Sequence, residues 1–139
     1  MKSQSQRKLD WYWEHPEWDD LVLEAQVDRA IRSGTCKPPD WKWKTPRPYN
    51  GFFGEARIAG WKKVKVALKL GLLPKPERCS ICLRSPAGQF HNEDYSRPLK
   101  AKPICPSCHR ILHQRFRYPE TWSNLLTTHS QPGAWFAHL

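Results

Sequence analysis

The chain has 139 residues, about the length of one domain, and its 39% hydrophobic and 26% charged residues are ordinary for a folded protein. That composition excludes a wholly disordered chain, and no apolar run approaches the length of a signal peptide or a membrane span. The formal net charge is +10. Residues 1–40 hold 6 basic and 8 acidic side chains, whereas residues 41–78 hold 10 and 2. A basic body behind an acidic segment favours nucleic acid as a partner over an evenly solvated surface.

The first predicted element is a helix from about Pro16 to Ser33. Proline suits the first helical turn, and the acidic residues that follow it complement the positive end of the helix dipole. Gly34 can end the helix in a left-handed conformation. The acidic surface of this helix is the expected contact for a host protein partner, if there is one.

A Pro-rich linker over residues 35–50 follows, in which aromatic residues alternate with cations. Trp41, Trp43 and Tyr49 can stack on bases while the neighbouring cations bind phosphates. The same rings can instead pack into the core with the lysines facing solvent. The sequence leaves both interpretations open.

Residues 1–50 are assigned to an N-terminal helical region with this basic linker, and residues 51–139 to a second domain that includes a C-terminal helix. The second domain is expected to begin with a helix over about Glu55–Leu70, because apolar residues recur there at helical spacing. Four cations are the candidate nucleic-acid contacts, three of them on another face of this helix. They are Lys62, Lys65, Lys69 and Arg110.

Two Cys-x-x-Cys pairs, Cys79 with Cys82 and Cys105 with Cys108, are separated by 22 residues. Each pair can form a tight turn, so four thiolates can bind one zinc ion tetrahedrally. A site with four protein ligands has no open position and is structural; an iron centre is the alternative. We expect a cytoplasmic protein, whose thiols are reduced, and the odd count of 5 cysteines also favours a metal over disulfides. Cys36 has no partner in this pattern.

A second metal site is predicted around three histidines. A short strand is expected to end at His91, residues 99–104 to return to the second cysteine pair, and residues 106–117 to form a helix. On that helix His109 and His113 are four residues apart and face the same side. The three imidazoles leave positions open for water and phosphate. Alternatively, the two helix histidines are ordinary surface residues, or His109 supports the cysteines.

Four stretches of the chain resemble the HNH endonuclease family, and most closely its small, phage-encoded, zinc-containing members. They are GEARIAGWKKVKVALKLG, KPERCSIC, HNEDYSRPL and ICPSCHRILH, within residues 54–113. The resemblance implies an α+β protein of the host cytosol with a ββα-metal unit on a structural zinc site. It also implies a DNA endonuclease that uses Mg²⁺, Mn²⁺ or Zn²⁺.

The resemblance implies a role for each matching residue. His91, His109 and His113 would bind the catalytic metal, and Asn92 occupies the position of the general base, which is normally histidine. Lys100 falls where the family has an asparagine that braces the loop. A carboxamide lacks the basicity of an imidazole, and the loss of a general base costs about 10²–10⁴ in rate.

Three functions therefore compete. The first is a metal-dependent endonuclease whose base is impaired, or replaced by His91, Glu93 or Asp94. The second is a catalytically inactive HNH-like protein that binds DNA or a host protein and acts as a regulator or inhibitor. The third is a zinc-ribbon regulator that never held a catalytic metal. Asn92 and Lys100 favour the second function, whereas the three histidines favour the first.

Overall fold

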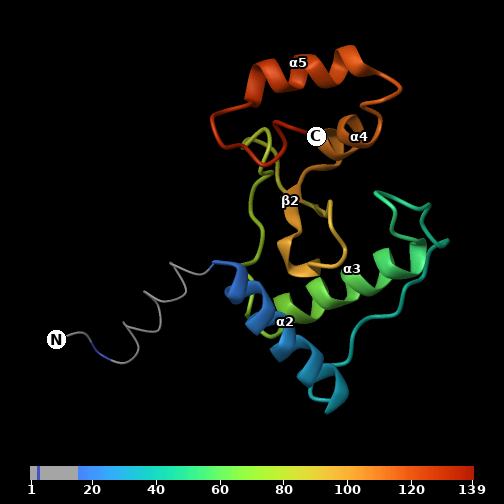
Figure 1. Ribbon diagram of the computed structural model, residues 1–139, viewed down its shortest axis with the longest axis vertical. Helices are drawn as coiled ribbons and strands as arrows, with labels where there is room; N and C mark the ends of the chain where they lie inside the picture. The colour runs from blue at the N-terminus through green and yellow to red at the C-terminus, as the bar shows by residue number, and fades with distance from the viewer. Residues whose placement is uncertain (1–2, 4–15) are drawn as a thin grey trace. The chain divides into compact units, whose positions relative to one another are not determined.

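The computed structural model describes residue 3 and residues 16–139, and these residues combine helices with a small antiparallel sheet (Figure 1). In chain order the elements are α2 (Pro16–Arg32), α3 (Gly54–Lys69), β1 (Gln89–His91), the 3-10 helix η1 (Pro98–Lys100), β2 (Lys102–Ile104), α4 (Pro106–His113) and α5 (Pro119–His129). The predicted α+β class is confirmed. Apart from Ser3, the N-terminal region before Pro16 lies outside the described residues. None of the helices described is both long and apolar enough to cross a membrane.

The chain divides into two compact units. Unit 1 contains residues 1–74 and 92–101, and unit 2 contains residues 75–91 and 102–139. The loop between β1 and β2 therefore belongs to unit 1, whereas both strands belong to unit 2. The division into compact units does not show whether residues 1–50 and 51–139 fold independently. The predicted domain boundary at residue 50 therefore stays a prediction.

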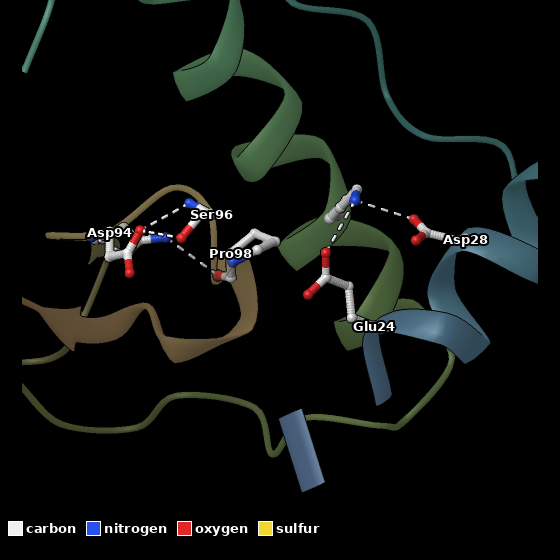
Figure 2. A network of polar contacts seen from close by, with 7 residues as sticks. Glu24, Asp28, Asp94, Ser96 and Pro98 are labelled. Atoms are coloured by element: carbon white, nitrogen blue, oxygen red, sulfur yellow. Dashed lines mark hydrogen bonds and ion pairs between the residues drawn. The ribbon is translucent and has the colours of Figure 1, made fainter. Parts of the chain in front are cut away.

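Helix α2 packs against α3 in unit 1. The amine of Lys63 on α3 lies 3.3 Å from Oε1 of Glu24 and 3.1 Å from Oδ1 of Asp28, both on α2 (Figure 2). Partly exposed ion pairs of this kind contribute about 0.2–1 kcal/mol each, so burial of apolar side chains has to supply most of the stability. The buried side chains on these two helices include Val27, Ala30, Val64, Val66 and Ala67.

The helices predicted in unit 1 are confirmed to within one residue at each end. Helix α2 ends at Arg32, two residues before Gly34, which has the expected left-handed φ of 75°. Helix α3 begins at Gly54, where an added Cβ would collide with the carbonyl oxygen of Pro46. Glycine at this position therefore lets the linker run directly against the start of α3.

The loop over residues 92–101 is braced by its own polar side chains (Figure 2). Oδ1 of Asn92 accepts a hydrogen bond from the backbone N–H of Asp94 at 2.9 Å, and Nδ2 of Asn92 donates to the carbonyl of Pro98 at 3.4 Å. Oδ1 of Asp94 accepts from the backbone N–H of Ser96 at 2.9 Å and from its hydroxyl at 2.5 Å. Short polar side chains that bond the nearby backbone in this way favour a compact turn.

Tyr95 and η1 pack the same loop against α3. A Cβ on Gly60 would lie 2.9 Å from the ring of Tyr95, so glycine permits this close approach. Nε of Arg57 donates to the hydroxyl of Tyr95 at 3.2 Å. The return segment predicted over residues 99–104 consists of the end of η1 and then β2.

Unit 2 is built around the β1–β2 hairpin and its four cysteines. The strands are antiparallel, with Gln89 opposite Ile104 and His91 opposite Lys102. Three of the cysteines belong to the hydrophobic core of the unit, beside apolar side chains from both helices and the C-terminal segment. The core residues are Cys79, Ile81, Ile104, Cys105, Cys108, Leu112, Trp122, Leu125 and Phe136.

Helix α4 begins at Pro106 as predicted but ends at His113, so the predicted helical residues 114–117 are wrong. A proline disfavours the helical conformation in the residue that precedes it. Tyr118, directly before Pro119, accordingly has a ψ of 70°, outside the helical region. Turns fill the interval before α5 begins at Pro119. The two histidines of α4 remain inside the helix despite its earlier end.

Candidate metal centres

Two tight turns bring the four predicted cysteines together in unit 2. The ligand sulfurs of Cys79, Cys82, Cys105 and Cys108 all lie within 4.8 Å of one another. In the first pair the backbone N–H of Ile81 donates to the sulfur of Cys79, and in the second that of Cys108 donates to the sulfur of Cys105, both at 3.4 Å. The cluster is confirmed as a group positioned to bind a metal ion such as zinc.

The electrostatics of the cluster call for a cation. Burial favours the neutral thiol of Cys82, yet backbone N–H groups in the turn that follows outweigh it and lower the pKa to about 6. Burial raises the pKa of Cys108 well above its usual range, and the neighbouring Cys105 and Cys79 raise it further. A divalent ion bound by the four sulfurs would compensate the charge of the thiolates that coordinate it.

The predicted three-histidine cluster is present as well. His91 comes from β1, His109 and His113 come from α4, and their ligand nitrogens lie within 4.8 Å of one another. Nδ1 of His91 lies 3.2 Å from Nε2 of His109, and Nε2 of His113 lies 2.9 Å from the same atom. His91 is buried, His109 is half-buried and His113 is exposed, so the cluster opens to solvent at His113.

The two separations measured from Nε2 of His109 fit one divalent ion. An ion bound at about 2.0–2.1 Å requires neighbouring nitrogens about 2.9 Å apart in octahedral geometry and about 3.3 Å apart in tetrahedral geometry. The observed separations of 3.2 and 2.9 Å lie in this interval. Three ligands also leave coordination positions for water or phosphate, which four cysteine ligands do not.

Two residues not predicted from the sequence orient these imidazoles. Nδ1 of His109 lies 2.7 Å from Oε1 of Gln89, and this hydrogen bond leaves Nε2 to face the cluster. The ring of Trp135 stacks on His91, with centroids 5.8 Å apart and an interplanar angle of 23°, and its Nε1 donates to the hydroxyl of Ser80 at 3.1 Å. Strand alternation places Gln89 on the same face as His91 and could have revealed it. No local pattern connects Trp135 with His91.

The chain matches no protein-family model, no curated protein and no solved structure. The two clusters are therefore interpreted from their own geometry. The HNH resemblance stays a prediction.

Three of the residues predicted to supply or replace the general base are engaged within unit 1. Asn92 is buried, and both ends of its amide hydrogen-bond inside the loop. Oε1 of Glu93 accepts from the hydroxyl of Tyr49 at 2.6 Å. Hydrogen bonds from Ser96 hold the pKa of Asp94 below its usual value, which makes this carboxylate a weaker base.

Lys100 occupies the position at which the HNH family has an asparagine that braces the loop, but the side chain of Lys100 makes an ion pair instead. Its amine lies 3.6 Å from Oδ2 of Asp20 on α2. The hydrogen bonds that brace the loop come from Asn92 instead. The side chain of Asn92 therefore stabilises the loop.

The predicted nucleic-acid contacts are distributed over both units. Lys65 and Lys69 on α3 are exposed and Lys62 is half-buried, all within unit 1. Arg110 is exposed on α4 in unit 2 and directly follows the histidine at position 109. Their role in binding nucleic acid stays a prediction.

Proposed function

We propose that this protein is a nucleic-acid-binding protein of the HNH type, a metal-dependent DNA endonuclease with an altered catalytic base. The observation that carries the proposal is the meeting of His91 on β1 with His109 and His113 on α4, beside a four-cysteine cluster. Donor atoms at these separations suit one Mg²⁺, Mn²⁺ or Zn²⁺ ion with open positions. The cysteines would hold structural zinc, and the short helix α4 contributes residues to both clusters.

The side chains around the histidines support binding and orientation of a phosphodiester. A divalent ion held there supplies Lewis-acid stabilisation of charge on a phosphate oxygen. Gln89 and Trp135 hold two of the imidazoles in place, and exposed His113 marks the side open to a large substrate. Arg110 offers a guanidinium to a neighbouring phosphate.

The step that this site supports least well is removal of a proton from the attacking water. Asn92 has no basicity, and the lowered pKa of Asp94 makes that side chain a poor replacement. Oε1 of Glu93 accepts a hydrogen bond from the hydroxyl of Tyr49, so this carboxylate is already engaged within unit 1. We therefore expect cleavage slower by about 10²–10⁴ than with a histidine at position 92.

The bracing role of Asn92 favours a second candidate function, a catalytically inactive DNA-binding protein. In that case the histidine cluster is retained as part of the scaffold, and binding to DNA or to a host protein is the whole activity. The acidic helix α2 is the expected contact for a host protein.

Nicking of supercoiled plasmid in Mg²⁺ or Mn²⁺ separates the two candidates. An endonuclease predicts slow nicking by the wild type, loss of nicking in His109→Ala, and faster nicking in Asn92→His. Asn92→Ser keeps an oxygen acceptor for the backbone N–H of Asp94 without adding a base and is the matched control for loop structure. Absence of nicking in the wild type and in Asn92→His, with DNA binding intact, would support the second candidate.

A further inference from the structure

We propose that three tryptophans in unit 1 form a binding site for an unpaired base of single-stranded nucleic acid. The tryptophan cluster consists of Trp41 and Trp43 from the linker and Trp61 from α3. Ring centroids are 5.0 Å apart for the first two, and 5.1 and 5.9 Å from those rings to Trp61. All three pairs meet edge to face, with interplanar angles of 71°, 84° and 88°.

Packing within unit 1 explains the presence of two of these rings but not that of the third. Trp41 and Trp61 are half-buried, and the indole N–H of Trp41 donates to the carbonyl of Lys44 at 3.0 Å. These two rings attach the linker to α3. Trp43 is 64% exposed, so burial explains little of its presence. Most of the surface of this residue is therefore available to a ligand.

The charge around the cluster selects an anionic ligand. Asp40 precedes the cluster, but residues 41–54 contain three cations and no acidic side chain. Lys42 and Lys44 are exposed on either side of Trp43 in the chain, and Nζ of Lys65 lies 5.7 Å from the ring centroid of Trp61. Aromatic clusters also bind quaternary ammonium groups, but this positive surrounding disfavours a cation.

Stacking selects a single strand among the phosphate-bearing ligands. In a duplex the faces of each base are covered by its neighbours, whereas an unpaired base can stack on an exposed indole. The phosphates beside such a base can then contact flexible lysines. This combination binds DNA or RNA single strands with little sequence preference. The inference does not rest on the histidine cluster, which belongs to unit 2.

The test measures binding of the whole protein to fluorescently labelled oligo(dT) of about 12 nucleotides, by anisotropy at low salt. Trp43→Ala should weaken binding about 5- to 150-fold, the effect of losing one stacked base. Trp43→Phe retains an aromatic face and should keep most of the affinity. Phe53→Ala is the matched control, because Phe53 is 72% exposed in the same unit and lies outside the cluster. Circular dichroism confirms that each variant is folded.

Two further arms define the ligand. Lys42→Gln combined with Lys44→Gln should reduce the slope of log affinity against log salt by about 1.4, or about 0.7 for each phosphate contact to a single strand. Oligo(U) in place of oligo(dT) tells whether RNA is preferred to DNA. Oligo(dT) binding is measured without added Mg²⁺ or Mn²⁺, so failure of the histidine metal site would leave this result unaffected.

Several results would overturn the inference. They are no binding of either oligonucleotide, wild-type affinity in Trp43→Ala, or an equal loss in Phe53→Ala. Binding to anionic phospholipid vesicles without binding to oligo(dT) would assign the cluster to a membrane surface instead.

Discussion

Replacement of Cys105 by serine should unfold unit 2, because a zinc ion held by the cysteine cluster would be the largest source of stability there. The unit contains strands of 3 residues each and helices of 8 and 11 residues. Helices shorter than about 12–15 residues and isolated hairpins are marginal without packing. A core of this size rarely contributes more than about 3–5 kcal/mol.

Zinc binding to a structural site of four cysteines is worth about 10–16 kcal/mol, and that free energy is folding free energy. Loss of the zinc would therefore remove most of the free energy that keeps the unit folded. Cys105 also accepts the hydrogen bond that caps α4, from the N–H of Cys108 at 3.4 Å. Both effects act in the same direction.

The assay combines zinc content, thermal melting and hydrogen exchange at the buried amides of Leu112 and Trp122. Cys105→Ser should lose zinc and the exchange protection of both amides. Cys36→Ser is the matched control: Cys36 is buried in unit 1 and lies outside the cluster, so the variant should keep its zinc and the protection of unit 2. Stoichiometric zinc loss with an unchanged melting curve and intact protection would refute the reasoning.

Three other perturbations have defined outcomes. Trp135→Leu should weaken Mn²⁺ binding at the histidines about tenfold while zinc is retained, measured by calorimetry, because supporting residues of ligands contribute 10–100-fold; unchanged Mn²⁺ affinity would contradict it. Ser96→Ala should raise the pKa of Asp94 toward its ordinary value, seen by NMR titration, since the Ser96 hydrogen bonds lower it. Lys63→Met should cost about 0.2–1 kcal/mol at neutral pH. Burial lowers the pKa of Lys63, but Asp28 and Glu24 outweigh it and raise the pKa above 10.5. The stability that the two ion pairs contribute is therefore complete below pH 10.5 and should be lost as the pH rises through the raised pKa.

Local patterns in the sequence predicted the parts of the fold that depend on short-range chemistry. The Cys-x-x-Cys spacing predicted the cysteine cluster, and helical spacing predicted that His109 and His113 share a face. Proline and glycine indicated the ends of α2, and the spacing of apolar residues indicated those of α3, all to within one residue, whereas the predicted end of α4 is four residues too late. There the turn before Pro119 begins earlier than helix periodicity indicates.

The contacts that bring distant segments together could not be predicted. Trp135 lies far along the chain from His91, and only the fold of unit 2 stacks the two rings. Similarly, Asn92 was assigned as a residue in the position of a catalytic base, whereas its side chain braces the loop through the Asp94 N–H. Polar side chains in loops can bond backbone or face a substrate, and the sequence alone does not distinguish these roles.

The number of divalent ions bound by each folded chain tests the central claim most directly. Native mass spectrometry and elemental analysis of protein equilibrated with Zn²⁺ and Mn²⁺ should find two ions per chain in the wild type. His109→Ala should retain one zinc at the cysteines and lose the second ion, because Nε2 of His109 lies between the other two ligand nitrogens. One ion per chain in both proteins, with the cysteine zinc present, would contradict the proposed catalytic metal site.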